Sequence, residues 1–194
     1  DLRADALRRC VGTMSLPLVE VDTNSLTGAI DAVLEEELGG REVVLPPVDD
    51  FWASRYRWCV GGSHNLGTNA SWLPPGTLPE LAAGVRWNRR AVSECVSENP
   101  LPAWDGSVHV SVAEKLEHGK GRAIYSCDTL SYYAFSWLLR PVEEKWRSRT
   151  VVLDPGRDGA AGMVNRVRGM TSRLDRPVYT MLDYSDFNSQ HTLA

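Results

Sequence analysis

The chain has 194 residues, of which 43% are hydrophobic and 24% charged, as is ordinary for a globular protein. No signal peptide and no apolar run long enough to cross a membrane is visible, so we expect no membrane partner. Residues 1–50 carry eleven acidic and four basic side chains, hence −7, and the remainder must carry +3 to give the net charge of −4. The part of the chain after residue 50 is therefore basic, which permits a polyanionic partner.

The four cysteines lie more than thirty residues apart and form no CxxC pair. This spacing argues against zinc and against a disulfide scaffold, and it favours free thiols in a reducing compartment. The chain begins with Asp1 rather than Met and ends at Ala194 in an unfinished helical pattern. Both ends indicate a fragment.

The first predicted element is an amphipathic helix over residues 25–38, because apolar residues recur at helical spacing. Asn24 or Ser25 suits its start, and Gly39-Gly40 suits its end. The apolar face comprises Leu26, Ile30, Val33, Leu34 and Leu38.

Proline and glycine divide the next part of the chain. After Pro46-Pro47, Asp49 suits the N-cap of an aromatic-rich helix that runs through Trp58. A glycine-rich turn follows at residues 61–67. Five prolines in residues 72–105 predict loops joined by short helices.

A strand pair is predicted next, with residues 108–112 in one strand and residues 121–126 in the other. Asp128 can cap the following helix, which Pro141 should kink or end.

Three further elements complete the predicted order. Residues 150–153 are a short strand candidate, and residues 161–170 have a helical pattern. Residues 178–182 are expected to form an apolar strand that leads directly into Asp183.

Three basic residues, Lys115, Lys120 and Arg122, fall within eight positions beside the predicted strand pair. Cations this close can neutralise a triphosphate and the pyrophosphate that leaves it. The planar guanidinium of Arg122 can also stack on a base. The alternative is a solvated hairpin whose charges bind nothing.

An acidic turn follows the last predicted strand. Asp183 and Asp186 offer the hard oxygen ligands that Mg²⁺ prefers, at a strand end where substrate phosphates have room. The alternative is a polar turn in which Asp186 or Ser185 only caps the next helix.

The glycine-rich turn begins Gly-Gly-Ser-His-Asn at residues 61–65. Exposed backbone amides with the short polar side chains of Ser63 and Asn65 can hold phosphates, although an ordinary loop explains the same pattern. His64 follows no metal-ligand spacing.

Together and in this order, these segments resemble the RNA-dependent RNA polymerases of double-stranded RNA viruses, especially the victorivirus-like members of the totivirus group. Residues 183–191, Asp-Tyr-Ser-Asp-Phe-Asn-Ser-Gln-His, resemble motif A, which typically reads D-x-D-D-F-N-S-x-H. Ser185 stands where a further Asp is common. Residues 117–124 resemble motif F, and residues 61–65 are similar to the motif G region. The resemblance covers about residues 50–194.

The resemblance implies an α+β right-hand polymerase fold, cut within the palm. Residues 1–50 would be an N-terminal acidic segment, residues 51–176 the fingers, and residues 177–194 the start of the palm.

The resemblance also implies roles for single residues. Asp183 matches the carboxylate that bridges two Mg²⁺ (or Mn²⁺) ions, and Asn188 matches the position that senses the ribose 2′-hydroxyl. Lys120 and Arg122 match contacts to the phosphates and base of the nucleotide, and Lys115 a further basic position of the nucleotide tunnel. Asp186 is assigned to the nucleotide site, with a helix cap as the alternative. The template side is assigned to Ser63, His64 and Asn65.

The implied partners are template RNA, ribonucleoside triphosphates and a viral capsid protein, in the virion interior and host cytoplasm. The second metal-binding carboxylate, in a Gly-Asp-Asp hairpin, and the Ser-Gly motif B are absent from these 194 residues. We therefore expect the piece alone to be inactive. One rival is a non-catalytic RNA-binding or capsid-associated module. Another is a reverse transcriptase, which Asn188 disfavours because such enzymes usually place a bulky aromatic residue there.

Overall fold

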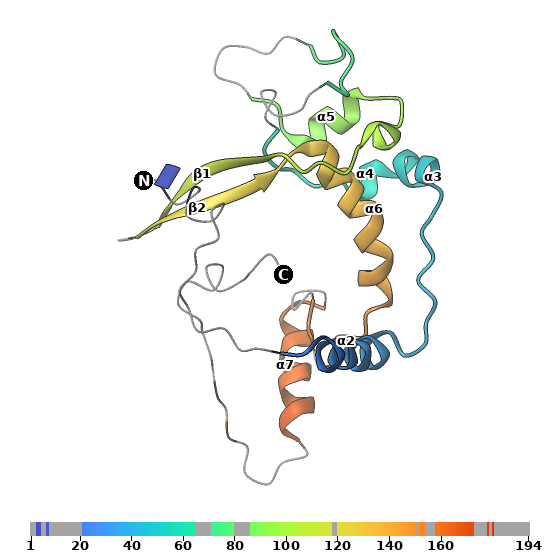
Figure 1. The fold of residues 1–194 in the computed structure, drawn as a ribbon, viewed down its shortest axis with the longest axis vertical. Helices are drawn as coiled ribbons and strands as arrows, with labels where there is room; N and C mark the ends of the chain where they lie inside the picture. Colours follow the sequence, from blue (N-terminus) through green and yellow to red (C-terminus); the bar gives the residue numbers. More distant parts are fainter. Residues whose placement is uncertain are drawn as a thin grey trace. The chain divides into compact units, whose positions relative to one another are not determined.

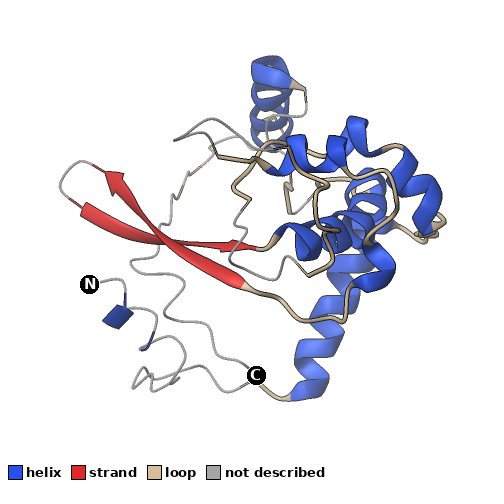
Figure 2. Cartoon of the chain, turned by 90° about the horizontal axis from the view of Figure 1, so that it is seen from above, coloured by secondary structure: helices blue, strands red, loops and turns tan. Residues whose placement is uncertain are grey.

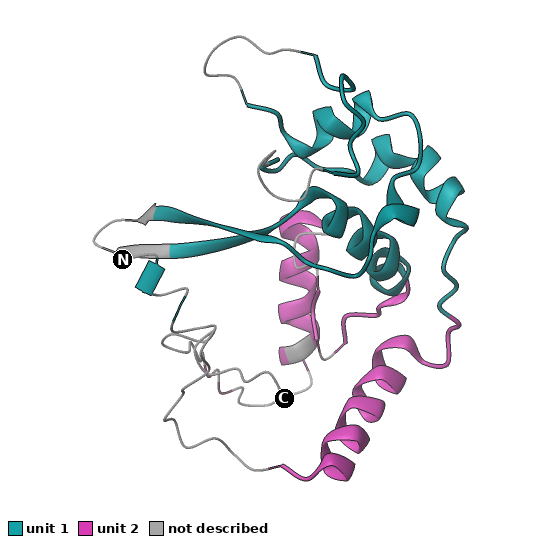
Figure 3. Ribbon diagram, turned by 45° about the horizontal axis from the view of Figure 1, so that its top comes forward, with its two compact units in different colours: residues 1–10, 43–144 teal, residues 11–42, 145–194 magenta. Residues whose placement is uncertain are grey.

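The computed structural model describes residues 3, 4, 7, 21–64, 71–79, 86–117, 120–149, 151–153, 158–172, 178 and 180 (Figure 1). The chain divides into two compact units (Figure 3). Unit 1 contains residues 1–10 and 43–144, and unit 2 contains residues 11–42 and 145–194.

Unit 1 combines short helices with one β-hairpin. Its elements in chain order are α3 (Val48–Ala53), α4 (Arg55–Trp58), α5 (Arg89–Cys95), a 3-10 helix (Leu101–Ala103), β1 (Val110–Glu117), β2 (Lys120–Cys127) and nearly all of α6 (Thr129–Lys145). Helices with a small antiparallel sheet are what the α+β prediction requires, and the short helices in residues 86–105 agree with the prediction for that region.

An aromatic cluster forms the core of unit 1. The rings of Phe51 and Trp58 stack with their centroids 4.2 Å apart. Tyr133 of α6 meets Trp52 and Trp58 edge to face, at 5.2 and 5.8 Å. Aromatic pairs of this geometry stabilise a fold beyond the area they bury. The cluster therefore holds α3, α4 and α6 together.

The aromatic-rich helix predicted up to Trp58 is two helices, α3 and α4, which meet at Ser54. The Ser54 hydroxyl donates to the Phe51 carbonyl (2.8 Å), a local bond that competes with helical pairing. The prediction of Asp49 as the N-cap is wrong, because Pro47 occupies that position. Asp49 lies in the first turn, where a carboxylate favours the positive end of the helix dipole, and it accepts a hydrogen bond from Asn99 (2.7 Å).

The predicted strand pair and the following helix are confirmed, although β1 begins at Val110 rather than at residue 108 and runs on to Glu117. β1 and β2 pair antiparallel over eight residues each, with Val110 opposite Cys127 and Glu117 opposite Lys120. Asp128 caps α6. That helix does not end at Pro141 but runs on to Lys145, because proline removes one backbone hydrogen bond and the other bonds of the helix remain.

Unit 2 contains α2 (Thr23–Leu38) and α7 (Gly159–Thr171), which confirm the helices predicted over residues 25–38 and 161–170. The side chain that caps α2 is Asp22, which accepts from the Ser25 amide (3.0 Å), rather than Asn24 or Ser25. Gly39 ends α2 as predicted, with a φ of 58° that favours glycine.

The buried residue of α2 is the acid Glu37, while Leu26, Ile30 and Leu34 of its apolar face are 39–51% exposed. The Glu37 carboxylate accepts hydrogen bonds from the amides of Arg149 (2.9 Å) and Val151 (2.8 Å).

Residues 151–153 form no strand, so the strand predicted over residues 150–153 is wrong for these three residues. The Val151 amide is bonded to a side chain of α2 instead of to a neighbouring strand. Of the strand predicted over residues 178–182, Val178 and Thr180 have no regular structure, and the other three residues lie outside the described ranges.

A further expectation concerns the cysteines. Cys59, Cys95 and Cys127 are free thiols, as predicted for these three described cysteines. None of the described helices has the length and apolar character needed to cross a membrane.

Candidate functional site

The β1–β2 hairpin extends away from the helices of unit 1 (Figure 2) and carries the basic residues singled out in the sequence. Its register places Lys115 opposite Arg122 and Glu117 opposite Lys120. Because side chains alternate along a strand, these four positions belong to one face of the hairpin. That face thus gathers three basic positions and one acidic position. Lys115 is exposed to solvent.

Asp128 organises the base of this hairpin. Its carboxylate accepts hydrogen bonds from the His109 amide, just before β1, and from the Ser131 amide in the first turn of α6, both at 3.0 Å. The Ser131 hydroxyl adds a third bond at 2.7 Å. Burial alone would raise the pKa of Asp128, but the bonds from Ser131 and His109 outweigh it and lower the pKa. A charged Asp128 therefore joins both strands to α6.

The glycine-rich turn packs beside the same junction. His64 is buried, with 9% of its surface exposed, and its Nδ1 lies 2.7 Å from the Thr129 hydroxyl at the start of α6. Ser63 forms an isolated β-bridge with Asn88. Asn65 lies outside the described residues. The turn is thus tied to α6 on one side and to the start of α5 on the other.

Arg89, the first residue of α5, lies at the centre of these contacts. Its guanidinium carbon is 3.9 Å from the centroid of the Tyr132 ring, a cation–π distance. Its Nη2 donates a long hydrogen bond (3.5 Å) to the carbonyl of Cys127, the last residue of β2. The Arg89 amide donates to the Gly62 carbonyl (2.9 Å). One residue therefore contacts the turn, the hairpin and α6.

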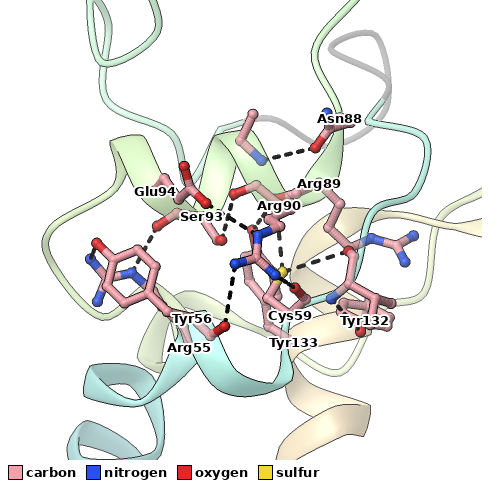
Figure 4. A network of polar contacts seen from close by, with 12 residues as sticks. Arg55, Tyr56, Cys59, Asn88, Arg89, Arg90, Ser93, Glu94, Tyr132 and Tyr133 are labelled. Carbon is pink, nitrogen blue, oxygen red and sulfur yellow. Dashed lines mark hydrogen bonds and ion pairs between the residues drawn. The ribbon is translucent and has the colours of Figure 1, made fainter.

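Two buried side chains of the core contact the backbone carbonyl of Arg89 (Figure 4). Its carbonyl accepts from the Tyr133 hydroxyl (3.1 Å) and, more weakly, from the Cys59 thiol (3.9 Å). Burial raises the pKa of Cys59 and that of Tyr133, so both groups stay protonated and act as donors.

His64 is neutral at physiological pH. Burial, and secondly the positive charge of Arg89, lower the pKa of its imidazole below the ordinary value of 6.5. A neutral ring can donate or accept at Nδ1, as its bond with Thr129 requires.

Sequence reasoning missed Arg89 and its partner Tyr132. A single arginine after a helix cap has no periodicity or spacing that marks it, and its contacts come from residues about 40 positions away. Arg55 was missed for the same reason; its buried guanidinium donates to the Ser93 carbonyl (2.8 Å) and joins α4 to α5.

The other predicted site residues are only partly within the described structure. For Lys120 and Arg122 the backbone is described as part of β2. Asp183, Asp186 and Asn188 lie outside the described ranges, as does the acidic turn as a whole. In the ranges that are described, no group of three ligand-type side chains gathers to hold a metal ion.

The chain was compared with known proteins. A "Probable RNA-directed RNA polymerase" of Helminthosporium victoriae virus-190S is 42% identical over 193 residues, which are 99% of this chain and 22% of that protein. One of the same name from Leishmania RNA virus 1 - 1 is 41% identical over all of this chain and 21% of its own length. That of Saccharomyces cerevisiae virus L-A is 29% identical over 75% of the chain.

The chain thus spans about a fifth of the first two relatives. No solved structure matches it. The profile of a family described as "Viral RNA-directed RNA-polymerase" matches residues 1–194. The predicted resemblance is therefore confirmed, and the chain belongs to the viral RNA-directed RNA polymerase family.

Proposed function

We propose that this chain is the fingers and the start of the palm of a right-hand polymerase that copies an RNA template into RNA. The observation that carries the proposal is the family match over residues 1–194, together with relatives named as RNA-directed RNA polymerases. On this view residues 1–50 form an N-terminal acidic segment, residues 51–176 the fingers, and residues 177–194 the start of the palm.

The basic face of the hairpin is the proposed nucleotide-binding element. Lys115, Lys120 and Arg122 occupy positions on one face, where their charges would neutralise the triphosphate. A guanidinium at position 122 can also pack on the plane of the base.

The acidic turn is the proposed catalytic centre. Asp183 offers the carboxylate oxygens that Mg²⁺ or Mn²⁺ prefers, and Asp186 is a second acid nearby in the sequence. When bound, such ions activate an attacking 3′-hydroxyl and stabilise the leaving pyrophosphate. The amide of Asn188 can both donate to and accept from a ribose 2′-hydroxyl, which suits ribonucleotides.

The glycine-rich turn is the proposed template side. Ser63 and Asn65 bring short polar groups and backbone amides that suit an RNA backbone. His64, whose ring is buried against Thr129, would act by holding the shape of the turn. The proposed partners are template RNA, ribonucleoside triphosphates and a viral capsid protein, with activity in the virion interior and host cytoplasm.

An Asp183→Asn change in the complete polymerase tests the proposal. Loss of the carboxylate should reduce templated ribonucleotide incorporation about a thousandfold or more, since a metal centre supplies several kcal/mol of transition-state stabilisation. RNA affinity, measured by filter binding, should stay within about threefold, because Asp183 is not assigned to the phosphate backbone.

The matched control is Asp175→Asn, an acid eight positions earlier that is not assigned to the site. It should leave synthesis nearly unchanged. Full synthesis by Asp183→Asn would instead mean that the metal-binding role of Asp183 is wrong. The rival function, a non-catalytic RNA-binding or capsid-associated module, predicts RNA binding without synthesis by the complete wild-type protein.

A further inference from the structure

The glycine-rich turn and the base of the hairpin come from distant parts of the sequence, and Arg89 lies between them. On the turn side, the Arg89 amide donates to Gly62, and the neighbouring Asn88 bridges to Ser63. On the hairpin side, the Arg89 guanidinium covers the Tyr132 ring and reaches the Cys127 carbonyl. The two sides are therefore connected through one residue, whose backbone contacts the turn and whose side chain contacts the hairpin and α6.

Gly62 shows how closely the guanidinium packs on the turn. A Cβ added at this glycine would lie 2.9 Å from Nη1 of Arg89 and 3.2 Å from its Cζ. A Cβ added at the adjacent Gly61 would meet nothing within 4 Å. Of these two glycines, Gly62 is the one whose missing side chain lets the guanidinium keep its place over Tyr132.

The burial of Arg89 is poorly explained by stability alone. Its side chain is buried, with 9% of the residue exposed, and its Nε has no hydrogen-bond partner among the described residues. An unsatisfied buried donor costs free energy, and replacing a buried charge by an apolar side chain of similar size is often neutral for stability. What the guanidinium provides is a fixed geometry: a planar group between a turn, a strand end and an aromatic ring.

We propose that Arg89 is a positioning residue, which fixes the β1–β2 hairpin relative to the turn of residues 61–64. The inference rests on the proposed function, in which the hairpin binds the nucleotide and the turn lies on the template side. Arg89 would then set the distance between the incoming nucleotide and the template base that selects it. Its effect would appear in nucleotide binding, although it is not assigned to contact the nucleotide.

Four variants of the complete polymerase test this role. Arg89→Met keeps the length of the side chain and removes the planar donor group; Arg89→Lys keeps the charge only. Gly62→Ala displaces the guanidinium without changing Arg89, and Gly61→Ala is its matched control. The measurements are amide exchange of the hairpin base and turn, melting temperature, and the separate kcat and KM for ribonucleotides.

Loss of the cation–π contact and of the hydrogen bond to Cys127 should raise the KM about tenfold in Arg89→Met and Gly62→Ala. Amide exchange in residues 61–64 and 109–111 should accelerate, and the melting temperature should change little. Arg89→Lys should lie between wild type and Arg89→Met. Gly61→Ala leaves the Arg89 guanidinium in place and should keep the amide exchange of residues 109–111 at the wild-type rate. A merely structural role would lower the active fraction, and hence kcat, at an unchanged KM.

Unchanged exchange in a folded Arg89→Met would overturn the proposal, as would an unchanged KM or equal effects of Gly61→Ala and Gly62→Ala. A different result would contradict the proposed function, namely that the complete wild-type polymerase incorporates no ribonucleotide. The exchange measurement would still decide whether Arg89 couples the turn to the hairpin in that case.

Discussion

His64 illustrates how a single buried group makes a turn sensitive to acid. Its ring is surrounded by the Arg89 charge and the Thr129 hydroxyl, and both the burial and the charge oppose protonation. The folded turn therefore holds a neutral imidazole at pH values where an exposed histidine would begin to take up a proton.

The sign of the pH dependence follows from this lowered pKa. As the pH falls below about 6.5, the opened turn binds a proton at His64 while the closed turn does not, so acid favours opening. Opening should become more favourable by up to about tenfold per pH unit, until the pH reaches the lower pKa of the closed state. Amide exchange of residues 61–64 between pH 7 and 5, corrected for the intrinsic exchange rate, measures this.

The variant His64→Asn places an amide where Nδ1 lay and cannot be protonated in this range. It should lose the acid-induced opening, whereas His109→Asn, at an exposed position, should keep it. An acid response of the turn that persists in His64→Asn would show that another group causes it.

Single residues of this kind mark the limit of prediction from the sequence. Asp128 was predicted correctly because it acts locally, on the first turn of the helix that it precedes. Arg89 and Glu37 were not, because their partners lie far along the chain and no periodicity marks them. A buried charge is defined by the tertiary structure that surrounds it.

Among the secondary-structure elements, α2 is connected by its last turn to Arg147, Arg149 and Val151. Glu37 has no exposed surface; its carboxylate accepts from two backbone amides, and its carbonyl accepts from the Arg147 amide (3.0 Å). The Arg147 guanidinium packs on Gly39, where a side chain would collide with it. This end of α2 thus gives an irregular segment the hydrogen bonds that a strand would otherwise provide.

A Glu37→Gln change should loosen this segment. Glutamine has one acceptor oxygen, and its amide donor would face a backbone N–H donor, which leaves buried groups unsatisfied at a cost of about 2 kcal/mol. Amide exchange of residues 149 and 151 in the complete polymerase should accelerate roughly thirtyfold, since 1.4 kcal/mol corresponds to a factor of ten.

Glu36→Gln is the matched control, because Glu36 is exposed on the same turn of α2. It should leave the exchange of this segment near the wild-type rate. Equal acceleration in both variants would mean that the loss of helix charge, and not the buried hydrogen bonds, controls the segment.

The helices and the hairpin were predictable to different degrees. Apolar spacing placed α2, and alternation placed β1, because each pattern follows from local geometry. The strand expected over residues 150–153 failed because four β-branched or apolar residues cannot show whether another strand lies beside them. Pro141, which was expected to kink or end the helix, does not end it, because the loss of one backbone hydrogen bond leaves the other bonds of α6 in place.

For the molecule as a whole, the order of short motifs was more informative than any element. The basic hairpin, the glycine-rich turn and the acidic turn each had a plain alternative, and it was their joint order that resembled the family to which the chain belongs. The roles of single residues in these motifs stay predictions. They depend on how the hairpin and the acidic turn are placed relative to each other, which local sequence patterns do not specify.

The 194-residue chain on its own should not synthesise RNA. A two-metal centre needs more than one carboxylate-bearing segment, and neither a Gly-Asp-Asp hairpin nor a Ser-Gly motif follows Asp183 within these residues. Incorporation of labelled ribonucleotides should equal the background of the complete Asp183→Asn polymerase. Amide protection of α6 serves as the folding control, because Tyr133 and Leu130 of that helix are in the core. If the 194-residue chain incorporated ribonucleotides above that background in a template-dependent manner, Asp183 would not need a second carboxylate-bearing segment for catalysis.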